Sequence, residues 1–128
     1  MNKYATLVVL LALVQYVVFT MRVGLARGKY KVEAPACAGD SNFERLFRVQ
    51  QNTMEQLIVM IPASYAFAYY VSPLWVLAPG LVFILGRFLY AAEYTKDPKT
   101  RTPGMVLTML ANVVLVLGAL FGLIKAML

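Results

Sequence analysis

The chain has 128 residues, of which 61% are apolar and only 14% are charged. About a quarter of the residues of a soluble domain are charged, and a chain of this length is enough for one domain only. Such a small domain could not hide this much apolar surface from water, so the composition excludes an ordinary soluble protein. Twelve Lys and Arg face six acidic residues, but they gather at the ends of apolar runs, which excludes a nucleic-acid-binding face.

The residue types that are scarce in this chain restrict its chemistry. There is no histidine, which excludes the usual general base, the Ser-His-Asp and Cys-His arrangements and the histidine-based zinc motif. The single cysteine, Cys37, allows no disulfide within the chain. Any reaction must therefore use Arg, Tyr, Glu, Asn or a bound small molecule, and we expect no metal.

Four apolar runs predict four membrane-spanning helices, at about residues 4–26, 43–71, 74–94 and 102–127. Spans near 20 residues match the roughly 30 Å hydrocarbon thickness of a bilayer. No run shows the alternation expected of a barrel strand. We therefore predict an all-α integral membrane protein, with a single four-transmembrane-helix bundle over residues 1–128.

The first run is interrupted by two polar residues, Gln15 and Arg22. Gly24-Leu25-Ala26 resembles a weak signal-peptide cleavage site. Arg22 lies between the apolar core and that site, so we expect the helix to be retained. Residues 27–42 follow as a polar loop.

The second run begins with a polar stripe. Arg45, Arg48, Asn52 and Glu55 are spaced by 3, 4 and 3 residues, which places them on one face of a helix. One interpretation is structural, with ion pairs and amide bonds that brace neighbouring helices. The other is a polar pocket for a zwitterion, because Arg binds carboxylates and Glu receives an ammonium group. Pro62 predicts a kink, which either opens space above the stripe or is tolerated as strain.

The third run ends with Arg87, Tyr90 and Tyr94, spaced by 3 and 4 residues. Alone, such a group is typical of an anchor at the membrane interface. Together with Arg27, the arginines that open the second run, and Arg101 at the start of the fourth run, it places five arginines near one membrane face. That number exceeds what topology requires, so some of these arginines are expected to bind anions.

The distribution of basic residues predicts the orientation. Loops 27–42 and 95–102 carry most of the Lys and Arg, the turn at 71–75 carries none, and the terminal segments carry Lys3 and Lys125. Under the positive-inside rule, both charged loops face the cytoplasm and both termini lie on the opposite side. We expect a bacterial inner membrane or an ER-type membrane.

These motifs resemble the MAPEG superfamily, the membrane-associated proteins in eicosanoid and glutathione metabolism. That family includes the microsomal glutathione transferases, leukotriene C4 synthase and the five-lipoxygenase-activating protein. The resemblance covers essentially the whole chain. Its most specific parts are Phe43-Glu44-Arg45-x-x-Arg48-x-Gln50-x-Asn52-x-x-Glu55, Gly86-Arg87-x-x-Tyr90-x-x-x-Tyr94 followed by Arg101, and the loop Ala26-Arg27-Gly28-Lys29-Tyr30-Lys31-Val32.

The resemblance implies a homotrimer of four-helix protomers that binds glutathione between neighbouring protomers. The implied glutathione contacts are Arg27, Arg48, Gln50, Asn52, Glu55, Tyr90 and Tyr94, with Arg87 in or beside the site. Arg101 matches the arginine thought to stabilise the glutathione thiolate. The non-enzymatic branch of the family lacks parts of this set, so the presence of Arg101 with both tyrosines favours an enzyme.

Two positions depart from leukotriene C4 synthase. A tyrosine that contacts glutathione follows the motif glutamate in that synthase, whereas Gln56 stands here, so the resemblance does not carry this one glutathione contact over. Its pair of arginines after the first helix is reduced to Arg27 followed by Gly28. Both departures argue against a dedicated leukotriene synthase and favour a broader member of the family, either bacterial-style or detoxifying.

The mechanism that the resemblance implies begins at the thiol. A free thiol has a pKa near 8.5, and a nearby guanidinium lowers that pKa and favours the thiolate. The leading hypothesis is a membrane-bound glutathione transferase that conjugates this thiolate to lipophilic electrophiles from the bilayer and also reduces lipid hydroperoxides. The alternatives are a non-enzymatic lipid-binding or scaffold protein of the same fold, and a small transporter or channel subunit whose charged stripe lines a pathway.

Overall fold

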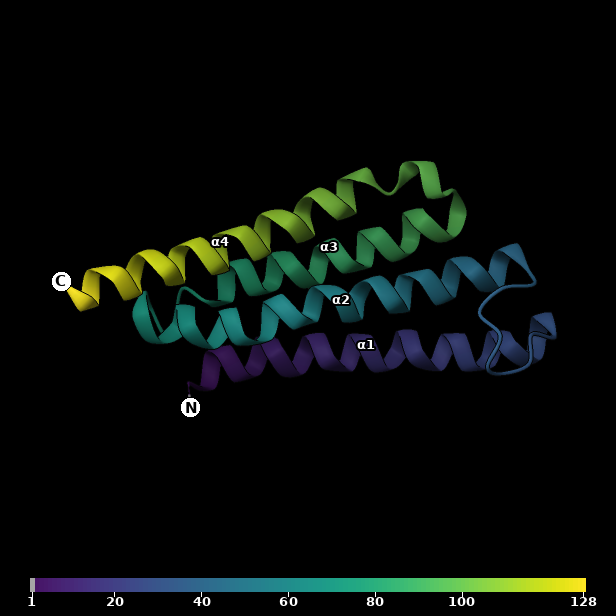
Figure 1. The fold of residues 1–128 in the computed structure, drawn as a ribbon, viewed down its shortest axis with the longest axis horizontal. Helices are drawn as coiled ribbons and strands as arrows, with labels where there is room; N and C mark the ends of the chain where they lie inside the picture. The colour runs from purple at the N-terminus through teal and green to yellow at the C-terminus, as the bar shows by residue number, and fades with distance from the viewer. Residues whose placement is uncertain (1) are drawn as a thin grey trace.

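Four long helices run side by side in the computed structural model, which describes residues 2–128 (Figure 1). They are α1 (Lys3–Tyr30), α2 (Ser41–Tyr70), α3 (Leu77–Lys96) and α4 (Thr102–Met127), with a short 3₁₀ helix, η1 (Pro98–Thr100), before α4. The α1–α2 and α3–α4 connections lie at one end of the bundle. Both termini and the α2–α3 turn lie at the other end (Figure 1). The all-helical, four-helix prediction is confirmed, and the two charged loops share one end as expected.

The helix ends show how local sequence sets these bounds. The side chain of Asn2 accepts hydrogen bonds from backbone N–H groups in the first turn of α1, and that of Asp40 does the same for α2. These N–H groups have no partner within the helix, so the two side chains cap the helices. The first helix continues past the expected end near residue 26, so the loop is shorter than residues 27–42. It ends where Lys31 adopts a left-handed conformation with φ of 57°, and the Val32 N–H then bonds back to the Arg27 carbonyl.

The third helix begins later than expected, at Leu77 rather than near residue 74. The backbone N–H of Trp75 donates to the Ser72 hydroxyl at 3.1 Å. Residues 72–75 therefore form the turn that reverses the chain between α2 and α3. Trp75 is exposed in this turn. Amphipathic Trp is typical of a membrane–water interface.

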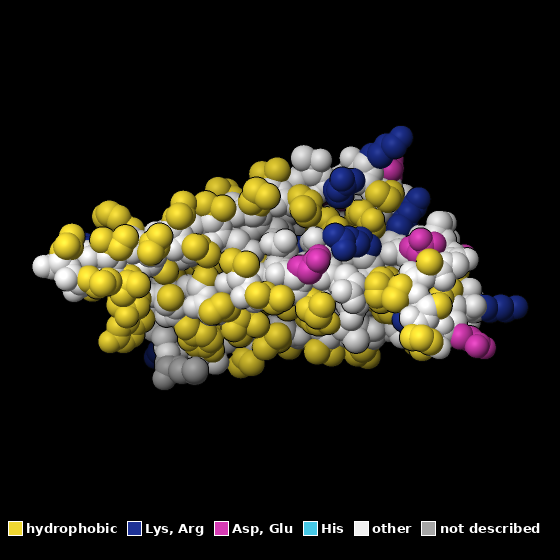
Figure 2. All heavy atoms as spheres, viewed as in Figure 1, with side chains coloured by type: hydrophobic (Ala, Val, Ile, Leu, Met, Phe, Trp, Pro, Cys, Tyr) yellow, Lys and Arg dark blue, Asp and Glu magenta, His cyan; other side chains and the backbone are white. Residues whose placement is uncertain are grey.

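Three helices, α1, α3 and α4, are long and apolar enough to cross a membrane. The remaining helix, α2, has a polar first half and an apolar second half. Figure 2 shows apolar side chains over most of the visible surface, while basic and acidic groups gather toward the end that carries the two charged loops. Exposed leucines and valines along α1 and α4 are expected for helices surrounded by lipid.

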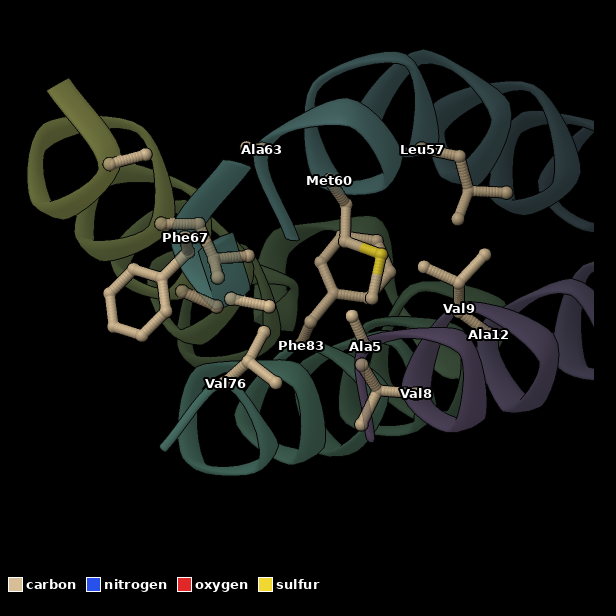
Figure 3. Close-up of a cluster of buried hydrophobic side chains, with 14 residues drawn as sticks. Ala5, Val8, Val9, Ala12, Leu57, Met60, Ala63, Phe67, Val76 and Phe83 are labelled. Carbon is tan, nitrogen blue, oxygen red and sulfur yellow. The ribbon is translucent and has the colours of Figure 1, made fainter. Parts of the chain in front are cut away.

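A core of apolar side chains from all four helices holds the bundle together. Met60 of α2 and Phe83 of α3 lie at its centre, facing Ala5 and Val9 of α1, and both are fully buried (Figure 3). Small residues bring the helices closer still. A Cβ at Gly86 would lie 2.9 Å from the backbone nitrogen of Thr108, so α3 and α4 touch almost backbone to backbone, as small residues permit in membrane bundles.

Candidate functional site

The polar stripe of α2 is present as the sequence spacing predicts. Arg48 and Glu55, two turns apart, form an ion pair with 3.6 Å between Nη1 and Oε1. Both side chains are about half exposed. An exposed pair of this kind contributes little stability, so both groups remain available to a charged ligand.

Arg87 of α3 is fully buried beside this stripe. Its Nη1 donates to Asn52 Oδ1 at 2.8 Å, and its guanidinium lies 4.4 Å from the centre of the Tyr90 ring. The Nε and Nη2 atoms have no hydrogen-bond partner among residues 2–128. A buried cation without an anion is costly, which indicates a site that is incomplete without a negatively charged group.

The two tyrosines of α3 extend the site toward the α3–α4 loop. Tyr90 is buried and Tyr94 is half-buried, and their rings stack with centroids 5.4 Å apart and an interplanar angle of 15°. Arg48, Arg87 and Arg101 all lie close enough to Tyr90 to act on it electrostatically. Arg87 contacts this pair through the Tyr90 ring, whereas Arg48 and Arg101 act on Tyr90 at longer range.

Arg101 is exposed at the start of α4. Its Nη1 donates to the Pro98 carbonyl at 2.7 Å, so η1 fixes the direction of the side chain. The rigid turn through Pro98 thus supports the residue predicted to act on a thiolate.

Two predicted site residues lie elsewhere. Gln50 is about half a turn around α2 from Arg48, and its Nε2 donates to Tyr16 Oη at 3.2 Å on α1. Arg27 donates to the Ala36 carbonyl at 2.7 Å and lies over the Phe43 ring, 4.9 Å from its centre. Within one protomer the structure does not bring these two residues to the stripe.

The seven other predicted residues share one region of the bundle. They are Arg48, Asn52, Glu55, Arg87, Tyr90, Tyr94 and Arg101. The predicted residues thus fall into two groups: a stripe group formed by these seven, and an α1 group formed by Arg27 and Gln50. The Oε1 atom of Gln50 is buried and accepts no hydrogen bond from the described part of the chain.

Arg45 belongs to the predicted stripe but has a structural contact. Its Nη1 donates to the carbonyls of Lys96 and Thr95, at 3.0 and 3.4 Å. These carbonyls end α3, where a cation is favourable. The bracing interpretation of the stripe therefore applies to Arg45, whereas the exposed Arg48–Glu55 pair and the buried Arg87 fit the pocket interpretation.

Sequence reasoning missed one polar contact between α2 and α4. Asn112 Nδ2 donates to Gln56 Oε1 at 3.0 Å. Asn112 is the one amide in the apolar run at 102–127, and a lone amide at membrane depth is a signal that could have identified it.

An apolar groove runs between α2 and α4 next to these amides. One part, of about 300 Å³, is lined by Gln56, Asn112 and neighbouring apolar residues. A second part, of about 440 Å³, includes Pro62, Ala66 and Leu120. Both parts are lined by Val59 and Val116, so they adjoin each other between α2 and α4, and we call them together the α2–α4 groove.

Comparison with known proteins identifies the family. The MAPEG family model matches residues 4–121. An uncharacterized protein of Synechocystis sp. is 40% identical over 121 residues, which are 94% of this chain and 88% of that protein. Microsomal glutathione S-transferase 2 of Homo sapiens is 39% identical over 103 residues, 80% of this chain and 70% of that protein. The corresponding protein of Bos taurus is 37% identical over 91 residues, 71% of this chain and 62% of that protein. This chain is therefore homologous to microsomal glutathione S-transferase 2 and belongs to the MAPEG family of integral membrane proteins.

Proposed function

We propose that this protein is a membrane-bound glutathione transferase that conjugates the glutathione thiolate to lipophilic electrophiles and also reduces lipid hydroperoxides. The observation that carries the proposal is the buried guanidinium of Arg87, two nitrogens of which have no hydrogen-bond partner within residues 2–128, beside an available Arg48–Glu55 pair. The relatives named as glutathione S-transferases support the choice of ligand.

Glutathione matches the charges of the stripe group. It is a zwitterionic tripeptide with two carboxylates, one ammonium group and one thiol. Arg48 and Arg87 would donate charge-assisted hydrogen bonds to the carboxylate oxygens, and Glu55 would accept hydrogen bonds from the ammonium group. Asn52 would keep Arg87 oriented through the bond at 2.8 Å, while Tyr90 and Tyr94 would pack against the peptide.

The α1 group supports a homotrimer with shared sites. Gln50 lies on the side of α2 that faces α1, where it bonds to Tyr16, and Arg27 lies near the end of α1, over the Phe43 ring. Within one protomer, both residues would therefore lie away from a glutathione bound at Arg48. They can contact a glutathione held by the stripe group of a neighbour. Each site would then combine the stripe group of one protomer with the α1 group of the next, and a closed ring of protomers makes all such sites equivalent.

The chemical step requires a thiolate. At neutral pH only a few per cent of a free thiol is ionised, because its pKa is near 8.5. Arg101 would lower the pKa of the bound thiol by stabilising the negative sulfur. The thiolate then attacks an electrophilic carbon in conjugation. In the peroxidase reaction two glutathione molecules reduce one lipid hydroperoxide, giving glutathione disulfide, the lipid alcohol and water.

The orientation follows from the same proposal. All four helices would cross the bilayer, with α2 held among the three apolar helices, and both charged loops would face the cytoplasm. The stripe group lies near those loops, so water-soluble glutathione would arrive from the cytoplasm. The electrophile would arrive from the bilayer through the α2–α4 groove.

The direct test is to measure glutathione binding and turnover with the purified protein in nanodiscs. Calorimetry with glutathione and conjugation of 1-chloro-2,4-dinitrobenzene should both give a signal. Glu55→Gln keeps the shape of the side chain but removes its charge, so we expect weaker glutathione binding with a smaller effect on kcat. Unchanged affinity in Glu55→Gln would contradict the role of Glu55. Glutathione binding without turnover of any electrophile would favour a lipid-binding or scaffold protein.

A further inference from the structure

The Gln56–Asn112 contact is a polar feature in an otherwise apolar groove. Both side chains line the 300 Å³ part of the α2–α4 groove, alongside Met109 and Val113. The contact lies next to Glu55 in the chain but contacts α4 instead of the stripe group. It is not among the glutathione contacts proposed above.

Asn112 fixes the orientation of the Gln56 amide. Asn112 is only 6% exposed, and its Nδ2 donates to Gln56 Oε1 at 3.0 Å and lies 3.4 Å from the Gln56 carbonyl oxygen. The acceptor end of the Gln56 side chain is thus occupied. Its Nε2 atom donates to no group among residues 2–128, and the half-buried side chain leaves this atom accessible from the groove. The Oδ1 atom of Asn112 is buried and accepts no hydrogen bond from the same residues. In an apolar groove, an unused N–H favours a ligand that offers an acceptor.

The groove continues the stripe along one face of α2. Arg48, Asn52, Gln56, Val59 and Ala63 follow each other at intervals of three or four residues, which places them on one side of the helix. From Gln56 to Tyr70, at the far end of the groove, the helix rises about 21 Å. This length and the apolar lining suit an extended hydrocarbon chain whose reactive end lies toward the stripe group.

We propose that Gln56 is a specificity-determining residue whose Nε2 donates a hydrogen bond to an oxygen on the hydrocarbon chain of the electrophile. Asn112 acts as a positioning residue through Gln56 Oε1. The occupant of the groove is then an oxygenated acyl-type chain, bearing a hydroxyl or hydroperoxyl group, rather than a plain hydrocarbon. This inference rests on the proposed transferase function and names the substrate class of that site.

Two enals of the same length provide the test, because trans-2-nonenal and its 4-hydroxy derivative differ by one hydroxyl group. In both, the thiolate sulfur forms a bond to the β-carbon and the carbon–carbon double bond becomes single. The proton lost by the thiol ends on the α-carbon, so no atom leaves and no oxidant is needed. The measured quantity is the ratio of kcat/KM for the hydroxylated and plain enals.

We expect Gln56→Leu to lower this ratio about tenfold relative to the wild type, the effect of one hydrogen bond. Comparing variants cancels the difference in intrinsic reactivity between the two enals. Asn112→Leu should lower the ratio in the same direction, because it releases the Gln56 amide. Met109 lines the same part of the groove, and Met109→Leu is the control: it removes no hydrogen-bonding group, so the ratio should stay unchanged even where kcat/KM changes for both enals together.

Two results would overturn the inference. One is an unchanged ratio in both Gln56→Leu and Asn112→Leu while turnover is retained. The other is a raised KM for glutathione in Gln56→Leu with the ratio unchanged, which would assign Gln56 to the glutathione site. If the wild type conjugates neither enal nor 1-chloro-2,4-dinitrobenzene, the transferase proposal fails. Binding of the unreactive 4-nonanol then decides the groove assignment: Gln56→Leu should weaken it about tenfold, and equal binding would overturn the assignment.

Discussion

Arg87 is the one charged side chain that is fully buried among residues 2–128. Its guanidinium is fully buried, bonded to Asn52 and stacked on Tyr90, with two nitrogens that lack a partner in residues 2–128. A binding residue of this kind lowers the stability of the empty protein, because burying a cation without an anion is unfavourable. The increase in the free energy of unfolding when an anionic ligand binds would then measure how strongly that ligand interacts with Arg87.

The double variant Arg87→Met with Asn52→Leu should change stability and glutathione binding in different directions. Asn52 is replaced as well, because its amide would otherwise lose the hydrogen bond from Arg87. Without glutathione we expect an unchanged or raised Tm, because hydrophobic residues often replace a buried charge without loss. Saturating glutathione should raise the Tm of the wild type, since at about 100 times Kd a ligand adds about 2.7 kcal/mol. This shift should vanish in the variant. A glutathione-induced shift equal to that of the wild type would contradict the assignment.

Arg101→Ala should change the pH dependence of conjugation. A guanidinium lowers the pKa of the bound thiol, so its removal moves that pKa up toward about 8.5. We expect kcat to fall about 100-fold at pH 7 and to recover partly as the pH rises above 8.5, where the thiol ionises unaided. Arg101→Lys keeps the charge and should lie between the two. A uniform loss at all pH values would contradict a role in thiolate stabilisation.

Close approach of helices is the main feature at the scale of the elements. Gly104 of α4 lies against the backbone of Tyr90 in α3, so that a Cβ would lie 2.9 Å from the Gly86 carbonyl oxygen and closer still to Tyr90. Packing of α3 on α4 therefore sets the position of Tyr90 within the stripe group.

Gly104→Ala should force α3 and α4 apart and weaken glutathione binding together with stability. We expect a loss of about 1–3 kcal/mol, the range for overpacking. Gly24→Ala is the matched control, because an added Cβ at Gly24 has nothing within 4 Å. The two variants would be compared by thermal unfolding and glutathione calorimetry, and equal behaviour of both would contradict this view of the interface.

Lys31→Gly should stabilise the end of α1. Lys31 adopts the left-handed region with φ of 57°, which is unfavourable for a residue with a Cβ and free of strain for glycine. We expect a gain of about 1 kcal/mol in the free energy of unfolding. Lys29→Gly, inside the helix, should instead cost about 1 kcal/mol. A Tm change of the same sign in both variants would show that the terminal conformation is not responsible.

At the scale of the whole molecule, the proposed homotrimer predicts glutathione sites that are each shared by two protomers. If glutathione lies between protomers, a variant of the stripe group and a variant of the α1 group should complement each other. Glu55→Ala and Gln50→Leu would each be weakly active alone. In mixed trimers formed at equal amounts, about a quarter of the sites combine the two intact groups. Activity should return to that level, and no return despite proven subunit mixing would contradict the shared site.

Much of the helical frame and part of the site could be predicted from the sequence. Apolar run length predicts helices reliably, and the 3–4 spacing of Arg48, Asn52 and Glu55 depends only on helical geometry. Spacing also placed Arg45 on the same face, but it could not show that the α3 carbonyls already hold its guanidinium. The Gln56–Asn112 contact joins residues 56 positions apart. Periodicity within one helix carries no information about such a pair.

In the proposed transferase, the continuity of α2 would couple the binding of the two substrates. The helix runs unbroken from Ser41 to Tyr70, past Pro62, and one face carries both the stripe and the floor of the groove. Glu55 and Gln56 are consecutive residues within one continuous helix. The distance between the two proposed binding regions is therefore set by the helical repeat and not by a flexible loop. Moving the polar side chain of position 56 by one turn of α2 would change the distance between the two binding regions by about 5.4 Å. A preference for longer or shorter electrophiles would therefore change in steps of one helical turn.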